Sequence, residues 1–240
     1  MYELGDRKMP IAIIGAMDEE IDVFRSMLTN EKEVTMAHVL CIEGEINGIE
    51  VVVLKSGIGK VNAAIATTLV IERYHPRVII NTGSAGGFVQ DLLVGDVVIS
   101  KSLVQHDVDV TAFNYEHGQV PGLPATIPAS EMLITIAEEA MKKIDLSYQI
   151  GLIGSGDVFM ENKERVAGAR KLFPTMLAAE MEGAALAQVC YQYDVPFVVI
   201  RSLSDIAGKE SSVSFEEYLQ IAAQNAGKCI EYMIEHIEYM

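Results

Sequence analysis

The sequence predicts an α/β fold in which helices cover both faces of a largely parallel sheet. Five apolar runs rich in Val and Ile are typical of buried strands, and stretches with the length and periodicity of helices lie between them. Such alternation indicates a layered α/β architecture. With 240 residues, 50% of them hydrophobic, the chain is long enough to enclose a sizeable core.

The predicted strands are continuous apolar runs rather than alternating ones. Strands of a parallel sheet have this character because helices cover the sheet on each side. The runs are IAIIG (11–15), VVVLKSG (51–57), VIINTGS (78–84), QIGLIGSG (149–156) and PFVVIRSLSD (196–205).

Helices are predicted between these strands and after the last one. The C-terminal segment 214–240 is amphipathic and opens with Ser214 as a candidate N-cap, with Glu217 three residues later. The other predicted helices are GKVNAAIATTLVIERYH (59–75), SEMLITIAEEAMKKI (130–144), NKERVAGARKLF (162–173) and EGAALAQVCYQY (182–193).

The composition excludes several classes of protein. Lys and Arg number 18 against 34 Asp and Glu, so the formal net charge is −16, and we expect neither nucleic acid nor a membrane surface as a partner. MYELGDRKMP has no apolar signal-peptide region, and IAIIGAM is too short to span a bilayer. Three separated cysteines, Cys41, Cys190 and Cys229, favour reduced thiols in a cytoplasmic protein.

One segment is unusually rich in turn residues. NYEHGQVPGLPATIPAS (114–130) contains three of the seven prolines. A loop of this length in a compact domain is more often functional than idle. We therefore expect one domain, with this loop as an excursion from it.

Four of the predicted strands end in small residues followed by a polar group. Ligands of open α/β sheets collect at the carboxyl ends of strands, and glycine there lets the backbone approach a ligand closely. One such strand end could simply be a tight turn, but four of them indicate that these residues form the rim of a binding site. They are SGIGK (56–60), NTGSAGG (81–87), GSGDVF (154–159) and SLSD (202–205).

Familiar short motifs are absent. SGIGKVN is not a phosphate loop, because Leu54 and Val61 stand where Gly and Ser or Thr are required. NTGSAGG lacks the GxGxxG spacing, and Ser84 does not lie in a GxSxG elbow. HDVD (106–109) offers metal-ligating residue types, but its alternation equally suits the polar edge of a strand. Without HExxH or a Cys/His cluster, we expect no metal.

Six acidic residues follow apolar strands, and these carry the candidate chemistry. Asp18 and Glu19 suit the first turn of a helix, where they complement its dipole, whereas Glu20 falls about a turn in and can point back over the strand end. The remaining three are Glu180, Glu182 and Asp205.

Glu180 and Glu182 lie within the apolar stretch LAAEMEGAALA. A lone ionised carboxylate is costly to bury, so these acids require partners. They share one face if they lie on a strand, and diverge if a helix starts at Glu182. A purely structural explanation, with either acid paired to Arg201, competes with a functional one at this point.

Seven segments, taken in order, resemble the 5′-methylthioadenosine/S-adenosylhomocysteine nucleosidases of the purine nucleoside phosphorylase superfamily. The likeness runs from Ile11 to about Ile237, and we expect residues 1–10 to form a disordered extension before a single domain over 11–240. The segments are IIGAMDEE, LKSGIGKVNAA, VIINTGSAGG, HDVDVTAFNYEHGQVPG, GSGDVF, AAEMEGAA and FVVIRSLSDIAG.

The resemblance implies both a fold and a reaction. The fold is a three-layer αβα sandwich around a twisted, mostly parallel or mixed sheet, as in the nucleoside phosphorylases, and the protein is a homodimer without metal or cofactor. The reaction is hydrolysis of the N-glycosidic bond of 5′-methylthioadenosine, S-adenosylhomocysteine and 5′-deoxyadenosine. It gives adenine and, from the first two substrates, a 5-alkylthioribose, and it serves methionine salvage and recycling of S-adenosylmethionine.

The resemblance also assigns catalytic roles by motif. Asp205, steadied by Ser204, is the general acid at adenine N7. Glu20 activates the attacking water with help from Arg201 and Ser84. Glu182 binds the ribose hydroxyls.

The remaining assignments concern substrate binding. Met181 supplies a backbone contact, Phe159 stacks on adenine, and the backbone around Phe159 and Met160 contacts the edge of the base. The 5′-alkylthio pocket is lined by Met17, Ile58 and Phe215. The partner subunit lends Val110, Phe113 and Pro121.

Physical chemistry agrees with these roles. Cleavage of the N-glycosidic bond passes through an oxocarbenium-like cation, so the leaving adenine must be protonated and water delivered. An ordinary Asp, with a pKa of about 3.9, is protonated roughly once in a thousand at pH 7. We therefore expect Asp205 to be desolvated, or to be protonated only with substrate bound. An ionised Glu182 can accept hydrogen bonds from both ribose hydroxyls, and for Glu180 we favour a contact with Arg201.

Two alternatives compete with the hydrolase. Phosphorylases of the superfamily place an arginine just before the equivalent of Gly83–Ser84, whereas Asn81 and Thr82 stand here, and the acids at 18–20 would repel phosphate. A non-catalytic nucleoside-binding protein could keep Phe159 and Glu182 but would not need both Glu20 and Asp205. Choice among adenine nucleosides depends on pocket shape, since related nucleosidases act on AMP or aminodeoxyfutalosine.

Overall fold

The computed structural model describes residues 9–89, 91–208 and 211–237, except for the side chains of residues 211–217. Most of residues 1–10, which we expected to be a disordered extension, lie outside the described residues. Among the described residues, no helix is long and apolar enough to cross a membrane. The described chain begins at Met9, and the carbonyl of Pro10 already accepts a hydrogen bond from the Arg77 N–H (3.1 Å).

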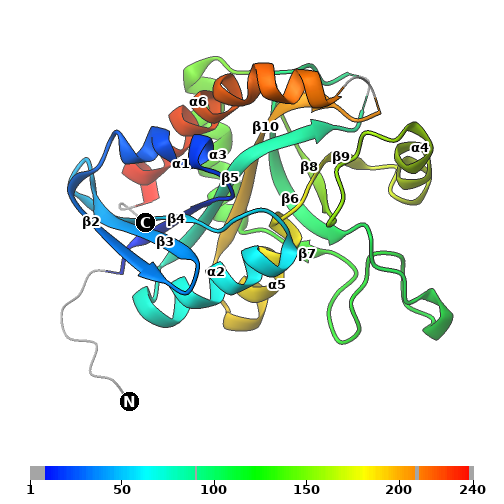
Figure 1. Ribbon diagram of the computed structural model, residues 1–240, viewed down its shortest axis with the longest axis horizontal. Helices are drawn as coiled ribbons and strands as arrows, with labels where there is room; N and C mark the ends of the chain where they lie inside the picture. Colours follow the sequence, from blue (N-terminus) through cyan, green and yellow to red (C-terminus); the bar gives the residue numbers. More distant parts are fainter. Residues whose placement is uncertain (1–8, 90, 209–210, 238–240) are drawn as a thin grey trace.

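The described residues form one ten-stranded sheet and six α-helices (Figure 1). A short 3₁₀ helix covers Thr111–Phe113. The strands are β1 (Ile11–Gly15), β2 (Thr29–Met36), β3 (Val39–Ile46), β4 (Ile49–Lys55), β5 (Val78–Gly87), β6 (Val97–Gln105), β7 (Ile127–Pro128), β8 (Tyr148–Ser155), β9 (Met176–Glu180) and β10 (Phe197–Ile206). The helices are α1 (Asp18–Arg25), α2 (Lys60–Tyr74), α3 (Glu131–Ile144), α4 (Lys163–Leu172), α5 (Gly183–Tyr193) and α6 (Ser211–Ile237).

The long strand β5 is the centre of the sheet. It pairs in parallel with β10 along most of its length and with β1 over its first half, and its last two residues pair antiparallel with β9. Because β6 joins β10 to β8, and β8 joins β9, the strands β5, β10, β6, β8 and β9 close on themselves like a barrel. Strands β1, β4, β3 and β2 extend from β5 as an open sheet.

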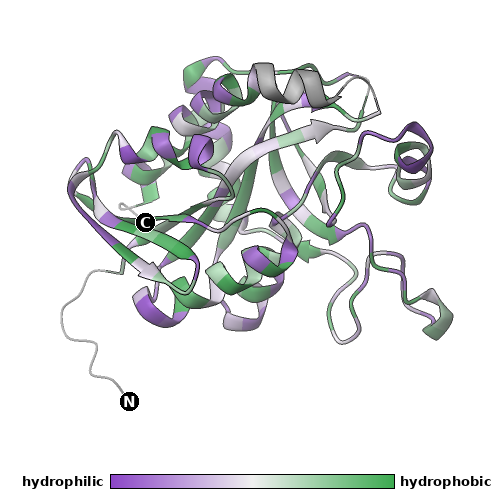
Figure 2. Cartoon of the chain, in the orientation of Figure 1, coloured by the Kyte–Doolittle hydropathy of each residue, from purple (hydrophilic) through white to green (hydrophobic). Residues whose placement is uncertain are grey.

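Helices cover both faces of the sheet, which confirms the predicted layered fold. Helices α1, α3 and α6 pack against one face, and α2 and α5 lie together on the other (Figure 1). The period of two in a strand divides the apolar residues between two cores. In β1, Ile11 and Ile13 point into the core under α1, α3 and α6, whereas Ala12 and Ile14 point into the core beside α2 and α5. Figure 2 shows much of the central sheet as hydrophobic.

All five predicted strands are present, with ends within about three residues of the expected ones. Strands β2, β3, β6, β7 and β9 were not predicted, and they make the sheet mixed rather than largely parallel, through antiparallel pairs such as β2–β3, β3–β4 and β6–β10. The edge strand β2 is mostly exposed and polar, so it carries no apolar signal. Strand β9 has only five residues.

The helix predictions need one correction. The C-terminal helix begins at Ser211, so Ser214 lies within its first turns and is not its N-cap. The N-terminal side chains of α3 and α4 do cap their helices, since Ser130 and Asn162 accept hydrogen bonds from backbone N–H groups three residues later. The acids at 18–20 begin a complete helix, α1, of which only the first turn was foreseen.

Candidate active site

A cavity of about 350 Å³ lies at the carboxyl ends of β1, β5, β9 and β10. This is the edge of the sheet at which the glycine-rich strand ends predicted a binding site. Its walls bring together residues from segments that are far apart in the sequence. They are Ala16, Met17, Glu20, Ile58, Ser84, Ala85, Gly86, Phe159, Ala179, Glu180, Met181, Glu182, Ser204 and Asp205.

Glu20 turns back over the end of β1 from the first turn of α1. Its Oε2 accepts hydrogen bonds from the backbone N–H groups of Ala16 (2.7 Å) and Met17 (3.2 Å). Its Oε1 accepts from the N–H (3.0 Å) and the hydroxyl (3.2 Å) of Ser84. The side chain is only 3% exposed, so these four donors replace the water that would otherwise stabilise the carboxylate.

Gly83 makes this arrangement possible. Its φ of +150° lies outside the range that L side chains adopt readily. A Cβ at this position would lie 2.1 Å from Nη1 of Arg201 and 2.6 Å from Oε1 of Glu20. The absence of a side chain therefore lets the guanidinium and the carboxylate both occupy the space that a Cβ of residue 83 would fill.

Arg201 lies behind the cavity and is fully buried. Its Nη2 donates to Asn81 Oδ1 (2.7 Å) and to the carboxylate of Glu180, and lies 3.5 Å from Oε2 of Glu182. Its Nη1 donates to the Thr82 carbonyl (3.0 Å). The expected contact between Glu180 and Arg201 is thus present, and Asn81 holds the guanidinium from the other side.

Glu180 organises the start of α5. Its carboxylate accepts hydrogen bonds from the N–H groups of Glu182 (3.0 Å) and Gly183 (2.8 Å), and from the hydroxyl of Ser155. Strand β9 ends at Glu180 and α5 starts at Gly183, so a helix does begin beside Glu182. The two side chains nevertheless do not diverge, because both line the cavity and both contact Nη2 of Arg201. Glu180 thus fixes the backbone that carries Glu182.

Glu182 is 5% exposed and has a smaller set of partners. Its Oε1 accepts a hydrogen bond from the Gly59 N–H (2.9 Å). Burial raises the pKa of the Glu182 carboxyl to about 8, and the negative charge of Glu180 adds to this effect, while Arg201 and the Gly59 N–H oppose it. In its ionised form this carboxylate has unused acceptor capacity at the cavity wall, and two hydroxyl donors of a ligand would both fill it and favour ionisation.

Asp205 and Ser204 line the cavity from the end of β10. A bulge between Leu203 and Asp205 shifts the register of β10 against β5, and bulges commonly redirect side chains beside binding sites. Asp205 is 3% exposed, and its Oδ1 accepts a hydrogen bond from the Ser204 hydroxyl (3.0 Å). The burial that we expected for a general acid is therefore present.

The cavity also has an apolar side. Met17, Ile58, Phe159 and Met181 line it, and Ile58 and Phe159 are half exposed in the isolated chain. An apolar and aromatic wall facing a few buried carboxylates suits a flat heterocycle joined to a polyhydroxylated ring.

Several of the residues assigned by resemblance do not line the cavity. Met160 is buried in an apolar cluster with Phe88 and Val166, and the side chain of Phe215 lies outside the described residues. Val110, Phe113 and Pro121 belong to an excursion that extends away from the sheet (Figure 1), and Phe113 is 74% exposed. Within one subunit these three side chains lie apart from the cavity.

HDVD (106–109) does not form the polar edge of a strand, which corrects one alternative. Strand β6 ends at Gln105, and a turn follows. Asp107 bonds to Lys60, and Asp109 bonds to Thr111. In the described part of the chain, no group of three or more His, Cys, Asp or Glu is placed to hold a metal ion.

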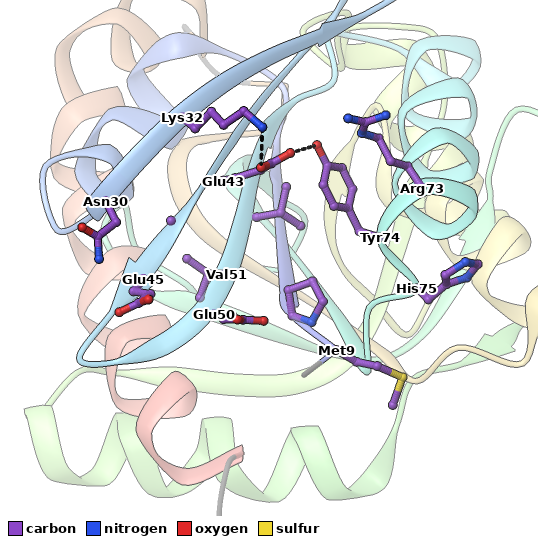
Figure 3. Close-up of a pocket in the computed structure, with 13 residues that line it drawn as sticks. Met9, Asn30, Lys32, Glu43, Glu45, Glu50, Val51, Arg73, Tyr74 and His75 are labelled. Carbon is purple, nitrogen blue, oxygen red and sulfur yellow. Dashed lines mark hydrogen bonds and ion pairs between the residues drawn. The ribbon is translucent and has the colours of Figure 1, made fainter. Parts of the chain in front are cut away.

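A second, larger cavity of about 560 Å³ lies at the opposite edge of the sheet, between β2, β3, β4 and the end of α2 (Figure 3). Of its three carboxylates, Glu43, Glu45 and Glu50, the first is paired with Lys32 (3.6 Å) and accepts a hydrogen bond from the Tyr74 hydroxyl (2.8 Å). These charges neutralise one another within the protein. We therefore place the chemistry in the smaller cavity, where the buried carboxylates converge.

Fold and site together define a class, the nucleoside-binding phosphorylase superfamily. A family model described as "Phosphorylase superfamily" matches residues 10–235. A 5′-methylthioadenosine/S-adenosylhomocysteine nucleosidase of Bacillus subtilis (strain 168) is 55% identical over 230 residues, which are 95% of this chain and 100% of the relative.

Solved structures agree with the sequence comparison. The nucleosidase of Neisseria meningitidis, in complex with methylthio-immucillin-A, superposes with a TM-score of 0.93 at 45% identity and covers 95% of this chain and 100% of its own. The nucleosidase of Colwellia psychrerythraea 34H, in complex with adenine, gives a TM-score of 0.93 at 47% identity, and the match covers 95% of this chain and 96% of that one. The chain belongs to the 5′-methylthioadenosine/S-adenosylhomocysteine nucleosidase family.

Proposed function

We propose that this protein hydrolyses the N-glycosidic bond of 5′-methylthioadenosine and S-adenosylhomocysteine, and of 5′-deoxyadenosine, to adenine and the corresponding ribose. One observation carries the proposal: Glu20, Glu182 and Asp205 are all at most 5% exposed and surround a single cavity. Burying three carboxylates in one place is costly, and a reaction that needs an acid, a base and a sugar-binding group explains why they are there.

Asp205 is the general acid in this proposal. It gives a proton to N7 of the purine as the bond between C1′ and N9 breaks, so that adenine leaves as a neutral molecule. The Ser204 hydroxyl holds the carboxyl in place through its hydrogen bond to Oδ1. Acid catalysis of this kind contributes about 10²- to 10⁴-fold.

Glu20 is the general base. It takes a proton from the water that attacks C1′ of the ribosyl cation on the face opposite adenine. Of its four donors, three are backbone N–H groups with fixed directions, whereas the Ser84 hydroxyl can rotate. We expect this hydroxyl to turn toward the substrate or the water, which frees an acceptor site on Oε1. Arg201 holds Glu180, which in turn supports Glu182.

Glu182 accepts hydrogen bonds from the ribose hydroxyls, with a backbone contact from Met181. The base stacks on Phe159, next to the backbone of Met160, and the 5′-alkylthio group lies against Met17 and Ile58. Both ends of the substrate therefore meet the apolar side of the cavity, while the reacting centre faces the carboxylates.

Water, rather than phosphate, is the nucleophile. Four carboxyl side chains line the cavity, and the residues that line it include no Lys, Arg or His. The buried cation behind it, Arg201, is already bound to Asn81, Thr82 and Glu180. A phosphate dianion would meet repulsion there, and no free cation among the described residues lining the cavity would offset it.

We extend the proposal to a homodimer, in which Val110, Phe113 and Pro121 of one subunit close the alkylthio pocket of the other. The exposed apolar side chains of Phe113, Val61 and Ile65 support this arrangement. The buried, unpaired cysteines support a reducing, cytoplasmic location.

The test is adenine release from 5′-methylthioadenosine with and without inorganic phosphate. We expect equal rates, with free methylthioribose as the sugar product in both. Release that requires phosphate and yields a sugar 1-phosphate would show a phosphorylase. Substrate binding without release would show a non-catalytic binding protein.

A further inference from the structure

Two loops that carry substrate-contacting residues are tied together by a third segment outside the cavity. The loop 56–60 carries Ile58 and the Gly59 N–H that bonds to Glu182. The loop 156–159 carries Phe159. Asp107 follows the end of β6 and contacts both of them.

The contacts form a closed set. Asp107 Oδ1 accepts a hydrogen bond from Lys60 Nζ (2.6 Å), and Asp107 Oδ2 accepts from the Asp157 N–H (3.0 Å). Asp157 Oδ1 in turn accepts from the Lys60 backbone N–H (2.8 Å). We call Lys60, Asp107 and Asp157 the loop clamp. Each member bonds to the other two, so the distance between the loops is fixed by three hydrogen bonds.

Asp157 also supplies what the start of α2 lacks. The N-cap residue of α2 is Gly59, which has no side chain to accept a hydrogen bond from the first turn. The carboxylate of Asp157 takes this role from another loop, at the positive end of the helix dipole. Gly59 has φ +98°, and a Cβ there would lie 3.1 Å from Asp157 Oδ1. Glycine therefore allows the close approach of the two loops.

The clamp is partly shielded from solvent. The Lys60 side chain is 17% exposed and that of Asp107 is 29% exposed, and Lys60 Nζ also donates to Gln105 Oε1 (3.1 Å). Burial opposes ionisation of Asp107, but the bonds from Lys60 and from the Asp157 N–H outweigh it, so the pKa of Asp107 lies below its ordinary value. An ion pair with these additional hydrogen bonds is more constraining than an isolated surface pair.

We propose that Asp107 is a positioning residue: through the loop clamp it sets the Gly59 N–H against Glu182 and holds Phe159 over the base. The inference rests on the proposed function and deepens it. Asp107 touches neither the cavity nor the reacting atoms, so its effect is on the geometry of the ribose and base contacts. Those contacts are made in the bound substrate as well as in the transition state. Loss of the clamp should therefore raise KM more than it lowers kcat.

The first test compares Asp107→Asn with Glu138→Gln. Glu138 forms an ion pair of similar length with Lys142 (2.8 Å) on the surface of α3, so its variant removes the same charge far from the cavity. We expect Asp107→Asn to raise KM for 5′-methylthioadenosine about 10-fold with kcat within about threefold, and Glu138→Gln to change neither. Equal KM values for Asp107→Asn and the wild type would overturn the inference.

A double-mutant cycle separates the clamp from general destabilisation. Lys60→Met and Asp107→Asn should each raise KM, and the double variant should raise it little further, because either change breaks the same contact. Fully additive effects would mean that the two residues act independently, and would overturn the clamp.

Amide hydrogen exchange gives a readout that does not require turnover. In Asp107→Asn, exchange should accelerate in residues 57–60 and 157–159, and remain unchanged in α3. Unchanged exchange in both loops would contradict the clamp whether or not the wild-type protein releases adenine. Absence of adenine release by the wild type would instead contradict the proposed function.

Discussion

The substitution Gly83→Ala tests how closely the Glu20 carboxylate and the buried Arg201 guanidinium are packed against β5. The added Cβ would lie 2.1 Å from Arg201 Nη1 and 2.6 Å from Glu20 Oε1, whereas ordinary contacts begin at 3.4 Å. The guanidinium must therefore move by about 1.3 Å and the carboxylate by about 0.8 Å, or β5 must shift by a similar amount. Displacements near 1 Å at a catalytic group cost about 10²-fold in rate.

Strain adds to the steric effect. The φ of Gly83, +150°, is unfavourable for alanine by about 1–3 kcal/mol, and displacing a buried ion pair adds to that cost. We expect kcat to fall at least 10²-fold and the free energy of unfolding to fall by about 2–4 kcal/mol.

The assay combines steady-state adenine release with urea unfolding. Turnover is measured at a temperature at which the variant is fully folded, so that loss of rate is not loss of protein. Gly168→Ala is the matched control, because no atom lies within 4 Å of its added Cβ and the residue lies within α4. It should keep full activity and gain up to about 1 kcal/mol of stability. A Gly83→Ala enzyme with kcat within threefold of the wild type would refute the close packing of Glu20 and Arg201.

Three further predictions follow from the site. The pKa of Glu182 is raised to about 8 in the folded protein, whereas the unfolded chain keeps its ordinary pKa near 4.5. Between these values the folded state holds a proton that the unfolded chain has lost. The stability that this proton contributes disappears as pH rises through 8. Between pH 5 and 8.5 the wild type should therefore lose stability on the order of 4 kcal/mol relative to Glu182→Gln in urea unfolding, and parallel pH curves would contradict this. Phe113→Ala should raise KM for 5′-methylthioadenosine about 10-fold, with less effect on 5′-deoxyadenosine, which lacks the alkylthio group; equal effects on both substrates would contradict a contact of Phe113 with that group. Ser84→Ala should lower kcat by about 10-fold or more, while leaving the N–H of residue 84 to hold Glu20, and an unchanged kcat would exclude a role for the hydroxyl.

The sequence predicted those parts of the fold that depend on local composition. Strands β1, β5 and β10 are buried along almost their whole length and β4 along most of it, as their continuous apolar runs indicate, whereas β8 is fully buried only over its last three residues. Strand β2 is held as an edge by pairing with β3, which its polar sequence does not reveal. In β6, Ser100, Lys101 and Ser102 interrupt the apolar residues at the point where the register against β8 shifts and Lys101 is exposed, so the strand has no continuous apolar run.

The sequence predicted the site residues whose side chains follow strand ends. It did not predict the contacts that backbone N–H groups make with those side chains. Glu20, Glu182 and Asp205 stand at strand ends, and apolar neighbours mark them as buried. The bond from the Gly59 N–H to Glu182 spans 123 residues and leaves no pattern in the sequence. The loop clamp likewise joins three separate segments, so only the fold brings its members together.

The central claim is that Asp205 protonates the leaving group while Glu20 activates water, and leaving-group dependence tests it most directly. The measurement is kcat for Asp205→Asn and Glu20→Gln on 5′-methylthioadenosine and on a 5-methylthioriboside of p-nitrophenol, whose leaving group needs no proton. We predict that Asp205→Asn loses about 10²- to 10⁴-fold on the adenine nucleoside but less than about 10-fold on the p-nitrophenyl riboside, whereas Glu20→Gln loses activity on both. Equal losses of Asp205→Asn on the two substrates would contradict the role of Asp205 as general acid.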